Sequence, residues 1–124
     1  MTHQMDFLFS LHSKHLPPRL PSQAVVKVGD SAPDFTLMGA GFETTTLSSL
    51  KGQKVVLAFF PAAYSGDADG GCQCQLASLK SISKEDGVSV LGITRDTPFV
   101  MGPWSEAAGI TCLSDVSNKT QETY

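Results

Sequence analysis

The stretch that decides the fold is Val55-Val56-Leu57-Ala58-Phe59-Phe60-Pro61. Its continuous apolar run predicts a strand that is covered on both faces, as in a parallel sheet. Pro61 has no backbone N–H and therefore ends the hydrogen-bond ladder of this strand. A second run of the same kind occupies residues 88–93, so two buried strands are expected. The chain between two parallel strands has to cross the sheet, and a helix usually makes this crossover.

The remaining pattern supplies the helices. Apolar residues recur at helical spacing from Cys72 onward, so a helix is predicted to begin there. A second helix is predicted over residues 98–108, with Gly109 as its end. Residues 111–113 read as a brief strand, and residues 118–124 as the opening turns of another helix. This alternation, with right-handed crossovers, predicts a parallel sheet that has helices on its faces.

Two short extended segments precede the apolar run. Residues 34–37, and residues 43–47 with their three β-branched threonines, are predicted to be partner strands. Residues 48–52 are predicted to be a short turn or helix. Residues 1–23 contain three prolines and are predicted to be a disordered tail. One domain, residues 24–124, is therefore expected.

Composition excludes several classes of protein. The chain of 124 residues has room for one domain, and its 41% apolar and 17% charged residues are typical of a globular core. The net charge of −3 argues against the basic stripe of a nucleic-acid-binding protein. No apolar run is long enough to cross a bilayer. We therefore expect neither a nucleic-acid partner nor a membrane partner.

Cysteine usage bears on the compartment. The three cysteines are an odd and small number, unlike a disulfide framework, so a reducing compartment is expected. The first expectation is a cytoplasmic protein. Lys14 and Arg19, against the single acid Asp6, leave a mitochondrial presequence as the alternative.

The histidines and cysteines limit the chemistry. All histidines lie in the tail, so the domain has no base for a Cys–His or Ser–His dyad. A Cys-x-Cys pair with one distant cysteine lacks the fourth ligand of a zinc or iron–sulfur site, so neither a metal nor a cofactor is expected. The histidines are His3, His12 and His15.

Cys72 is the candidate nucleophile, because a helix N-terminus lowers the pKa of a thiol. The alternative is that Cys72 is a buried apolar side chain on the inner stripe of its helix. Cys74, two positions further on, faces the other side of the helix and is expected to be exposed or partly buried. Cys112, on a short strand, and Trp104, in the helix predicted over residues 98–108, are expected in the core.

Several landmarks, in order, resemble the peroxiredoxin family of AhpC/TSA redoxins, especially its bacterioferritin-comigratory and thiol-peroxidase branches. The resemblance extends from Val25 to Tyr124. It implies an α/β, thioredoxin-like three-layer fold with a mainly parallel central sheet. It also implies a thiol-dependent peroxidase that reduces hydrogen peroxide or organic hydroperoxides through a cysteine sulfenic acid. The landmarks are residues 28–37, 47–52, 55–63, 94–99 and 113–115, with Trp104.

The family's active site has a proline, three residues, a threonine or serine, two residues and then the peroxidatic cysteine. Pro61 and Ser65 match the first two places, but six residues separate Ser65 from Cys72. Without a gap, Ala68 takes the cysteine's place; with a four-residue insertion, Cys72 does. The helical pattern that begins at Cys72 favours the insertion. The alternatives are a simple strand terminator for Pro61 and an ordinary turn residue for Ser65.

The resemblance also implies partners: a peroxide substrate, and thioredoxin or another thiol as the reductant. Ala77 stands where one branch has its resolving cysteine, so a mechanism with one cysteine is expected; whether Cys74 or Cys112 resolves the sulfenic acid stays open. The family continues with an arginine-bearing strand, a partner strand and a helix, so the chain resembles a truncated member. Arg95 is the only arginine in the domain.

A second function stays open beside the peroxidase. The chain can instead be a catalytically inactive thioredoxin-fold fragment that acts as a binding module. Without the last strands, residues 55–60 are expected to form an exposed sheet edge. We therefore expect a chain that is homo-oligomeric, partly unfolded, or completed by a partner.

Overall fold

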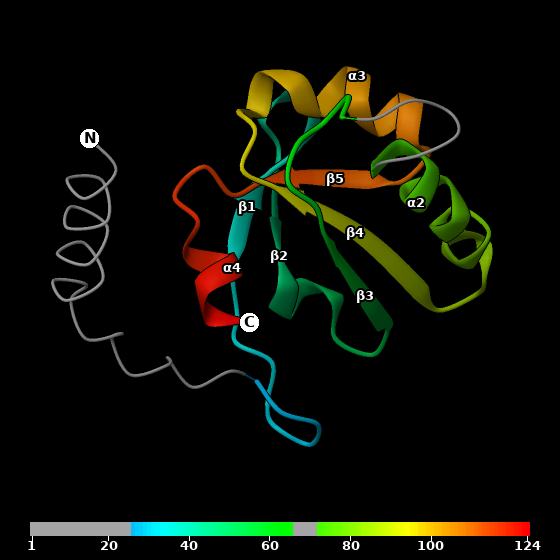
Figure 1. Cartoon of the computed structure of the whole chain (residues 1–124). Helices are drawn as coiled ribbons and strands as arrows, with labels where there is room; N and C mark the ends of the chain where they lie inside the picture. The colour runs from blue at the N-terminus through cyan, green and yellow to red at the C-terminus, as the bar shows by residue number, and fades with distance from the viewer. Residues whose placement is uncertain (1–25, 66–71) are drawn as a thin grey trace, which may run out of the picture.

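A computed structural model of the chain describes residues 26–65 and 72–124. A sheet of five strands has the order β2-β1-β5-β4-β3 (Figure 1). Strands β3, β4 and β5 are parallel, whereas β1 is antiparallel to both β2 and β5. The predicted parallel succession is confirmed for β3 to β5, and the predicted partner strands form an antiparallel pair. The strands are β1 (Thr36–Met38), β2 (Thr44–Thr46), β3 (Lys54–Phe59), β4 (Val88–Thr94) and β5 (Thr111–Ser114).

The apolar run forms β3 and packs on both faces of the sheet, as predicted. Val56 and Ala58 pack against the core cluster that contains Trp104. Val55 and Leu57, which alternate with them, pack against the opposite cluster. β3 is the end strand of the described sheet, so these side chains are only half-buried.

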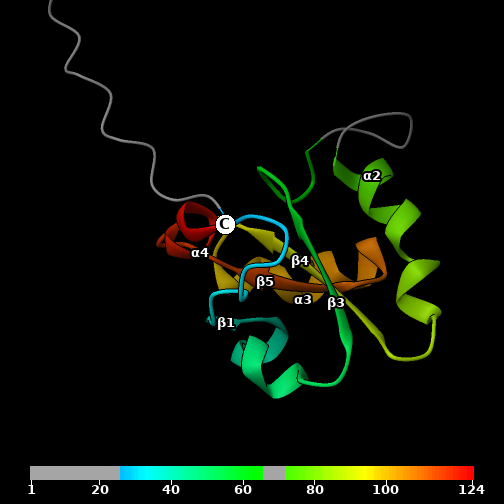
Figure 2. The ribbon, with the colours of Figure 1, turned by 90° about the horizontal axis from the view of Figure 1, so that it is seen from below.

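The helices cover the two faces unequally. α2 (Cys72–Leu79) and α3 (Pro98–Ala108) pack on the face that contains Trp104, and the 3₁₀ turn η2 (Leu47–Leu50) packs on the other. Figure 2 shows α2 and α4 (Lys119–Thr123) on opposite sides of the parallel strands. The result is the expected three-layer α/β arrangement. Two further 3₁₀ turns are η1 (Ala40–Phe42) and η3 (Ile82–Lys84).

Helix α3 has the predicted bounds because its ends carry strong signals. Pro98 occupies the first turn, where a missing N–H costs nothing. Gly109 follows with φ 71° and donates its N–H to the carbonyl of Ser105. Trp104 in this helix is fully buried, as is Cys112 in β5, so both core predictions are confirmed.

Some element bounds differ from the predictions. β1 begins two residues later than predicted, because the Asp34 carboxylate accepts the N–H groups of Phe35 and Ser48 at 3.0 and 2.9 Å. β3 ends at Phe59, although Phe60 is buried and still donates its N–H to Ile93 at 3.0 Å. The predicted tail lies outside the described residues. Within the described part, no helix combines the length and apolar character needed to span a bilayer.

Candidate active site

The predicted site lies where the parallel strands end. Because β3, β4 and β5 are parallel, their carboxyl ends meet at one edge of the sheet. β3 leads into residues 60–65, β4 into residues 95–97, and β5 into residues 115–118. This edge is where open α/β sheets bind ligands.

The loop after β3 contains two of the predicted site residues. Pro61 is exposed and follows the last ladder bond of the strand, as expected for a residue that ends a strand. Its place in the active site stays a prediction. The Ser65 hydroxyl donates to the carbonyl of Ala62 at 2.7 Å, which is a local turn bond. Tyr64 between them has φ 57°, and its ring lies 4.8 Å from that of Trp104. The loop therefore turns sharply and is attached to the core by an aromatic contact.

Asp96, just after β4, is a residue that sequence reasoning missed. Its Oδ2 accepts the N–H of Ala63 at 2.6 Å and the hydroxyl of Thr94 at 2.7 Å. Its carbonyl accepts the hydroxyl of Ser114 at 2.5 Å. One residue thus connects the ends of all three parallel strands. The only signal in the sequence is a carboxylate two residues after the end of a buried strand.

Helix α2 begins at Cys72, as the apolar spacing predicted. Leu76, one turn further on, is buried against the core. The first N–H groups of a helix have no partner within the helix, and the macrodipole favours a thiolate there. The side chains of Cys72 and Cys74 and residues 66–71 lie outside the described part. The grouping of Cys72 with Ser65 therefore stays a prediction.

Cys112 is unsuited to nucleophilic chemistry. Its side chain is completely buried. Burial raises the pKa of the thiol, a hydrogen bond with the Ser105 side chain opposes part of this shift, and the pKa is about 11. At pH 7 a thiol with this pKa is thiolate in about 10⁻⁴ of molecules. Cys112 packs in the same cluster as Trp104.

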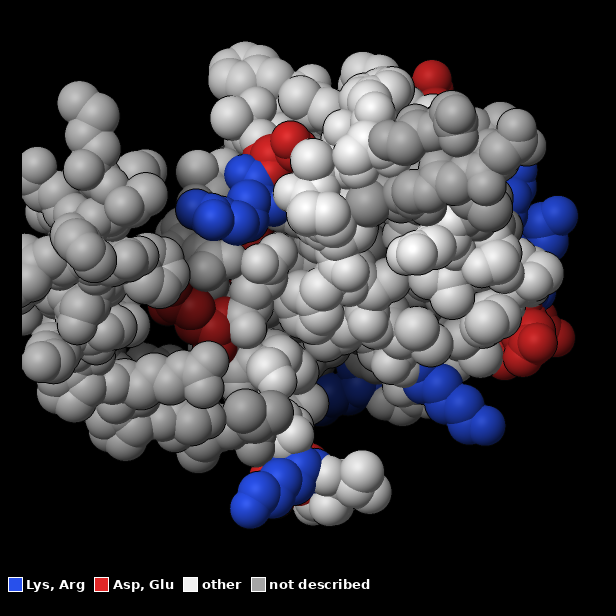
Figure 3. Space-filling model, in the orientation of Figure 1, with Lys and Arg blue, Asp and Glu red and all other residues white. Residues whose placement is uncertain are grey.

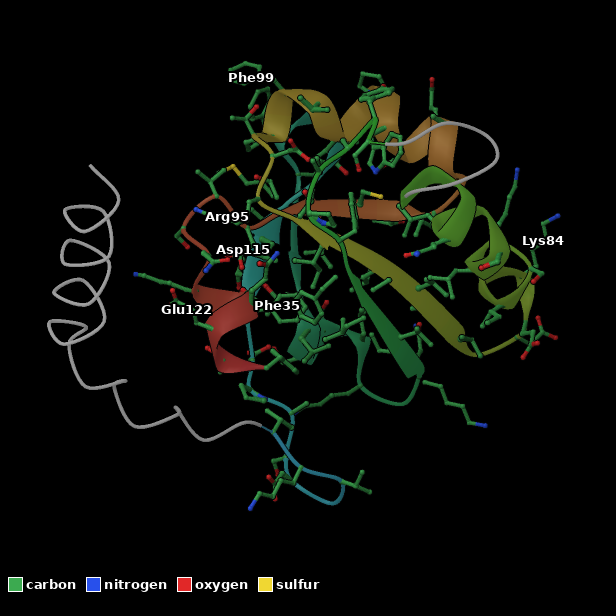
Figure 4. The ribbon with its side chains drawn as sticks, in the orientation of Figure 1. Phe35, Lys84, Arg95, Phe99, Asp115 and Glu122 are labelled. Carbon is green, nitrogen blue, oxygen red and sulfur yellow. The ribbon has the colours of Figure 1, made fainter. Side chains whose placement is uncertain are left out.

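Arg95 is the only basic residue in the described loops at this edge, which are residues 60–65, 95–97 and 115–118. Arg95 is exposed, and Figure 4 shows it pointing outward on the side of Asp115, away from α2. On the face in Figure 3, lysines and arginine lie apart from one another rather than in a stripe. No three of the described His, Cys, Asp and Glu side chains come together as a metal site.

Comparison with known proteins agrees with this arrangement. The sequence model of the AhpC/TSA family matches residues 28–124. The chain is 32% identical over 100 residues to a thiol peroxidase of Bacillus subtilis, covering 80% of the chain and 58% of that protein. It is 33% identical over 104 residues to peroxiredoxin Bcp of Escherichia coli, covering 80% and 64%. The chain thus spans about three fifths of the length of these curated relatives.

Solved structures of the same family resemble the fold of this chain. The structure of peroxidoxin BcpB from Mycobacterium tuberculosis superposes with a TM-score of 0.60 at 26% identity, covering 75% of this chain and 62% of that one. This similarity confirms the thioredoxin-like fold. With the match over residues 28–124, it shows that the chain belongs to the AhpC/TSA family, the peroxiredoxin family that its sequence resembles.

Proposed function

We propose that the chain is a thiol-dependent peroxidase that reduces hydrogen peroxide or organic hydroperoxides with the thiolate of Cys72. The observation that carries the proposal is the start of α2 at Cys72, in the segment that follows the Pro61–Ser65 loop of an AhpC/TSA chain. A helix N-terminus is the surrounding that turns a thiol into a nucleophile at neutral pH.

The reaction has two halves. In the first, the Cys72 thiolate attacks one peroxide oxygen; an S–O bond forms, the O–O bond breaks, and the departing hydroxide or alkoxide takes a proton from solvent. Cys72 is left as a sulfenic acid. In the second, a thiol of the reductant attacks the sulfenic sulfur and releases water. A second thiol of the reductant then breaks the mixed disulfide and restores Cys72.

Ser65 is proposed to orient the peroxide. A hydroxyl has one donor and two acceptor lone pairs, and the donor of Ser65 is committed to the carbonyl of Ala62. Its lone pairs can therefore accept the O–H of a hydroperoxide and direct the oxygen toward Cys72. Pro61 is proposed to start the turn that brings Ser65 to this position.

The reductant is proposed to be external, thioredoxin or another dithiol. Cys112 is completely buried and its pKa is about 11, so it does not reach a sulfenic acid at the helix start without opening the core. This leaves Cys74 as the only other cysteine to test as a resolving residue.

The test is a titration of reduced protein with hydrogen peroxide, with dimedone trapping of sulfenic acid and localisation by mass spectrometry. The expected result is fast, stoichiometric labelling at Cys72. Cys72→Ser abolishes it, whereas Cys112→Ser, the matched control, leaves it unchanged. Slow labelling that is spread over all three cysteines contradicts the proposal.

A second candidate is a binding module without catalysis. The observation that favours it is the position of Arg95, the only arginine after Arg19, which points away from α2. Labelling of Cys72 at the rate of a free thiol supports this reading in the same titration. A homo-oligomer is proposed in either case, because β3 is the end strand of the described sheet. Sedimentation velocity that shows a compact monomer contradicts the oligomer.

A further inference from the structure

We propose that Asp96 is a positioning residue: its carboxylate sets the orientation of the Ser65 hydroxyl through a single peptide group. The inference rests on the proposed function, because Ser65 is the residue proposed to orient the peroxide. Asp96 itself touches neither Cys72 nor the peroxide in this proposal.

The connection runs through the peptide bond between Ala62 and Ala63. Asp96 Oδ2 accepts the N–H of Ala63 at 2.6 Å, and the carbonyl of Ala62 accepts the Ser65 hydroxyl at 2.7 Å. That carbonyl and that N–H belong to the same peptide group, which is planar and rigid. The N–H and the carbonyl of a trans peptide point in opposite directions within its plane, so a carboxylate that holds the N–H also sets where the carbonyl meets the hydroxyl. Hydrogen bonds in such a chain also polarise one another.

Asp96 is itself held by the ends of two strands. The Thr94 hydroxyl donates to the same Oδ2 at 2.7 Å, and Thr94 is fully buried. The Ser114 hydroxyl, from the end of β5, donates to the Asp96 carbonyl at 2.5 Å. A positioning group needs a rigid support of this kind, because a loose support transmits no orientation.

The loop needs such a support because its backbone is strained. Tyr64, between Ala63 and Ser65, has φ 57°, a left-handed conformation that is uncommon for a residue with a side chain. Strain of this kind persists only where the surroundings hold it. Asp96 holds the residue before Tyr64, and Trp104 contacts the tyrosine ring at 4.8 Å.

The effect is expected to come from position and not from charge. A negative charge near a thiol raises its pKa and opposes the thiolate. Asp96→Asn keeps an oxygen that can accept both hydrogen bonds and removes the charge, whereas Asp96→Ala removes the acceptor. Comparison of the two variants separates the roles.

The experiment measures the second-order rate of Cys72 with hydrogen peroxide, the pH profile of Cys72 alkylation by iodoacetamide, and amide hydrogen exchange in residues 62–65. We expect Asp96→Ala to lower the peroxide rate about 10- to 100-fold. The midpoint of the pH profile for Cys72 alkylation should stay within a few tenths of a pH unit of the wild-type midpoint. Hydrogen exchange in residues 62–65 should become faster. Asp96→Asn should restore the rate to within about threefold of the wild type, less than 1 kcal/mol of transition-state free energy. The matched control is Asp34→Ala, which also removes a carboxylate that accepts two hydrogen bonds, here from two N–H groups far from this loop in the sequence.

Several results overturn the inference: a wild-type rate in Asp96→Ala, an equal loss in both Asp96 variants, or an equal loss in Asp34→Ala. If wild-type Cys72 does not react with peroxide, the proposed function fails. Hydrogen exchange in the loop then becomes the only test of whether Asp96 orients residues 62–65. If hydrogen exchange in residues 62–65 is faster in Asp96→Ala but not in Asp34→Ala, the orientation by Asp96 is supported. Unchanged exchange in Asp96→Ala overturns it. Should Asp96→Ala not fold, Thr94→Val removes one donor to Oδ2; wild-type rate and loop exchange in that variant also overturn the inference.

Discussion

A methyl group added at Gly92 tests how tightly β4 packs against β5. Gly92 lies in register with Cys112 on β5 and with Ala58 on β3. A Cβ at this position meets the Cys112 sulfur at 2.9 Å and the Phe60 ring at 3.1 Å, both closer than ordinary contact. The core here has no free space for the added atom.

The magnitude follows from two opposing contributions. Overpacking a close-packed core costs about 1–3 kcal/mol. Burial of one more methyl group returns about 0.8 kcal/mol. Gly92→Ala is therefore expected to lower the free energy of unfolding by roughly 0.2–2.2 kcal/mol, the difference between the two contributions. Cys112→Ala alone should lower it by a similar amount, because it leaves a small cavity.

The double variant makes the reasoning sharp. Cys112→Ala removes the sulfur that the new methyl group meets, so the two losses should not add. We expect a coupling energy of about 1–2 kcal/mol in favour of the double variant. Rescue stays incomplete because the Phe60 ring remains at 3.1 Å.

The assay is urea unfolding of all four proteins followed by circular dichroism, with the slope m compared to check that the folded states are alike. Gly102→Ala is the control: a Cβ there meets nothing within 4 Å, and the residue lies in α3, so this variant should be neutral or more stable. Additive losses in the double variant, or a wild-type stability in Gly92→Ala, would refute the packing described for β4 and β5.

Three further predictions use other parts of the chain. The pKa of Cys112 is raised from 9.0 to about 11, so the folded state holds its proton longer than the unfolded state; stability should therefore fall as the pH rises from about 9 to 11, by at most about 1.4 kcal/mol per pH unit, and Cys112→Ala should lose this part of the dependence in urea titrations. Hydrogen bonds from Ser48 and Phe35 hold the pKa of Asp34 below its usual value, so its stabilisation is present above pH 4 and lost at lower pH; Asp34→Asn should flatten the acid limb of a thermal-melting profile. Tyr124→Phe loses the hydrogen bond from the phenol to the carbonyl of Pro33 and keeps the ring, so the free energy of unfolding should fall by about 0.5–1.5 kcal/mol; an unchanged value contradicts the bond.

The elements were predictable because their signals are local. The apolar run of residues 55–60 identifies β3 to within a few residues. A strand that is buried on both faces is apolar whichever strands it pairs with, so the signal can be read from the run alone. Pro98 and Gly109 mark both ends of α3, because one residue suits a first turn and the other a left-handed end. The start of α2 at Cys72 follows from the same kind of local spacing.

Within the candidate site, the sequence pointed to Pro61, Ser65 and Cys72 through their order along the chain. It could not locate Asp96, because the bond from Ala63 joins residues 33 positions apart. The direction of Arg95 was also undetermined, since an exposed side chain after a strand can point several ways.

The sequence by itself determined the strands and helices, their order, the buried positions of Trp104 and Cys112, and the family to which the chain belongs. Only the tertiary structure decided that β1 lies against β5, that β3 ends the described sheet, and that Asp96 connects the three strand ends. The physical reason is the range of the interactions. Propensity and apolar spacing act over a few neighbouring residues, whereas strand pairing and buried hydrogen bonds join groups that become neighbours only when the whole chain has packed.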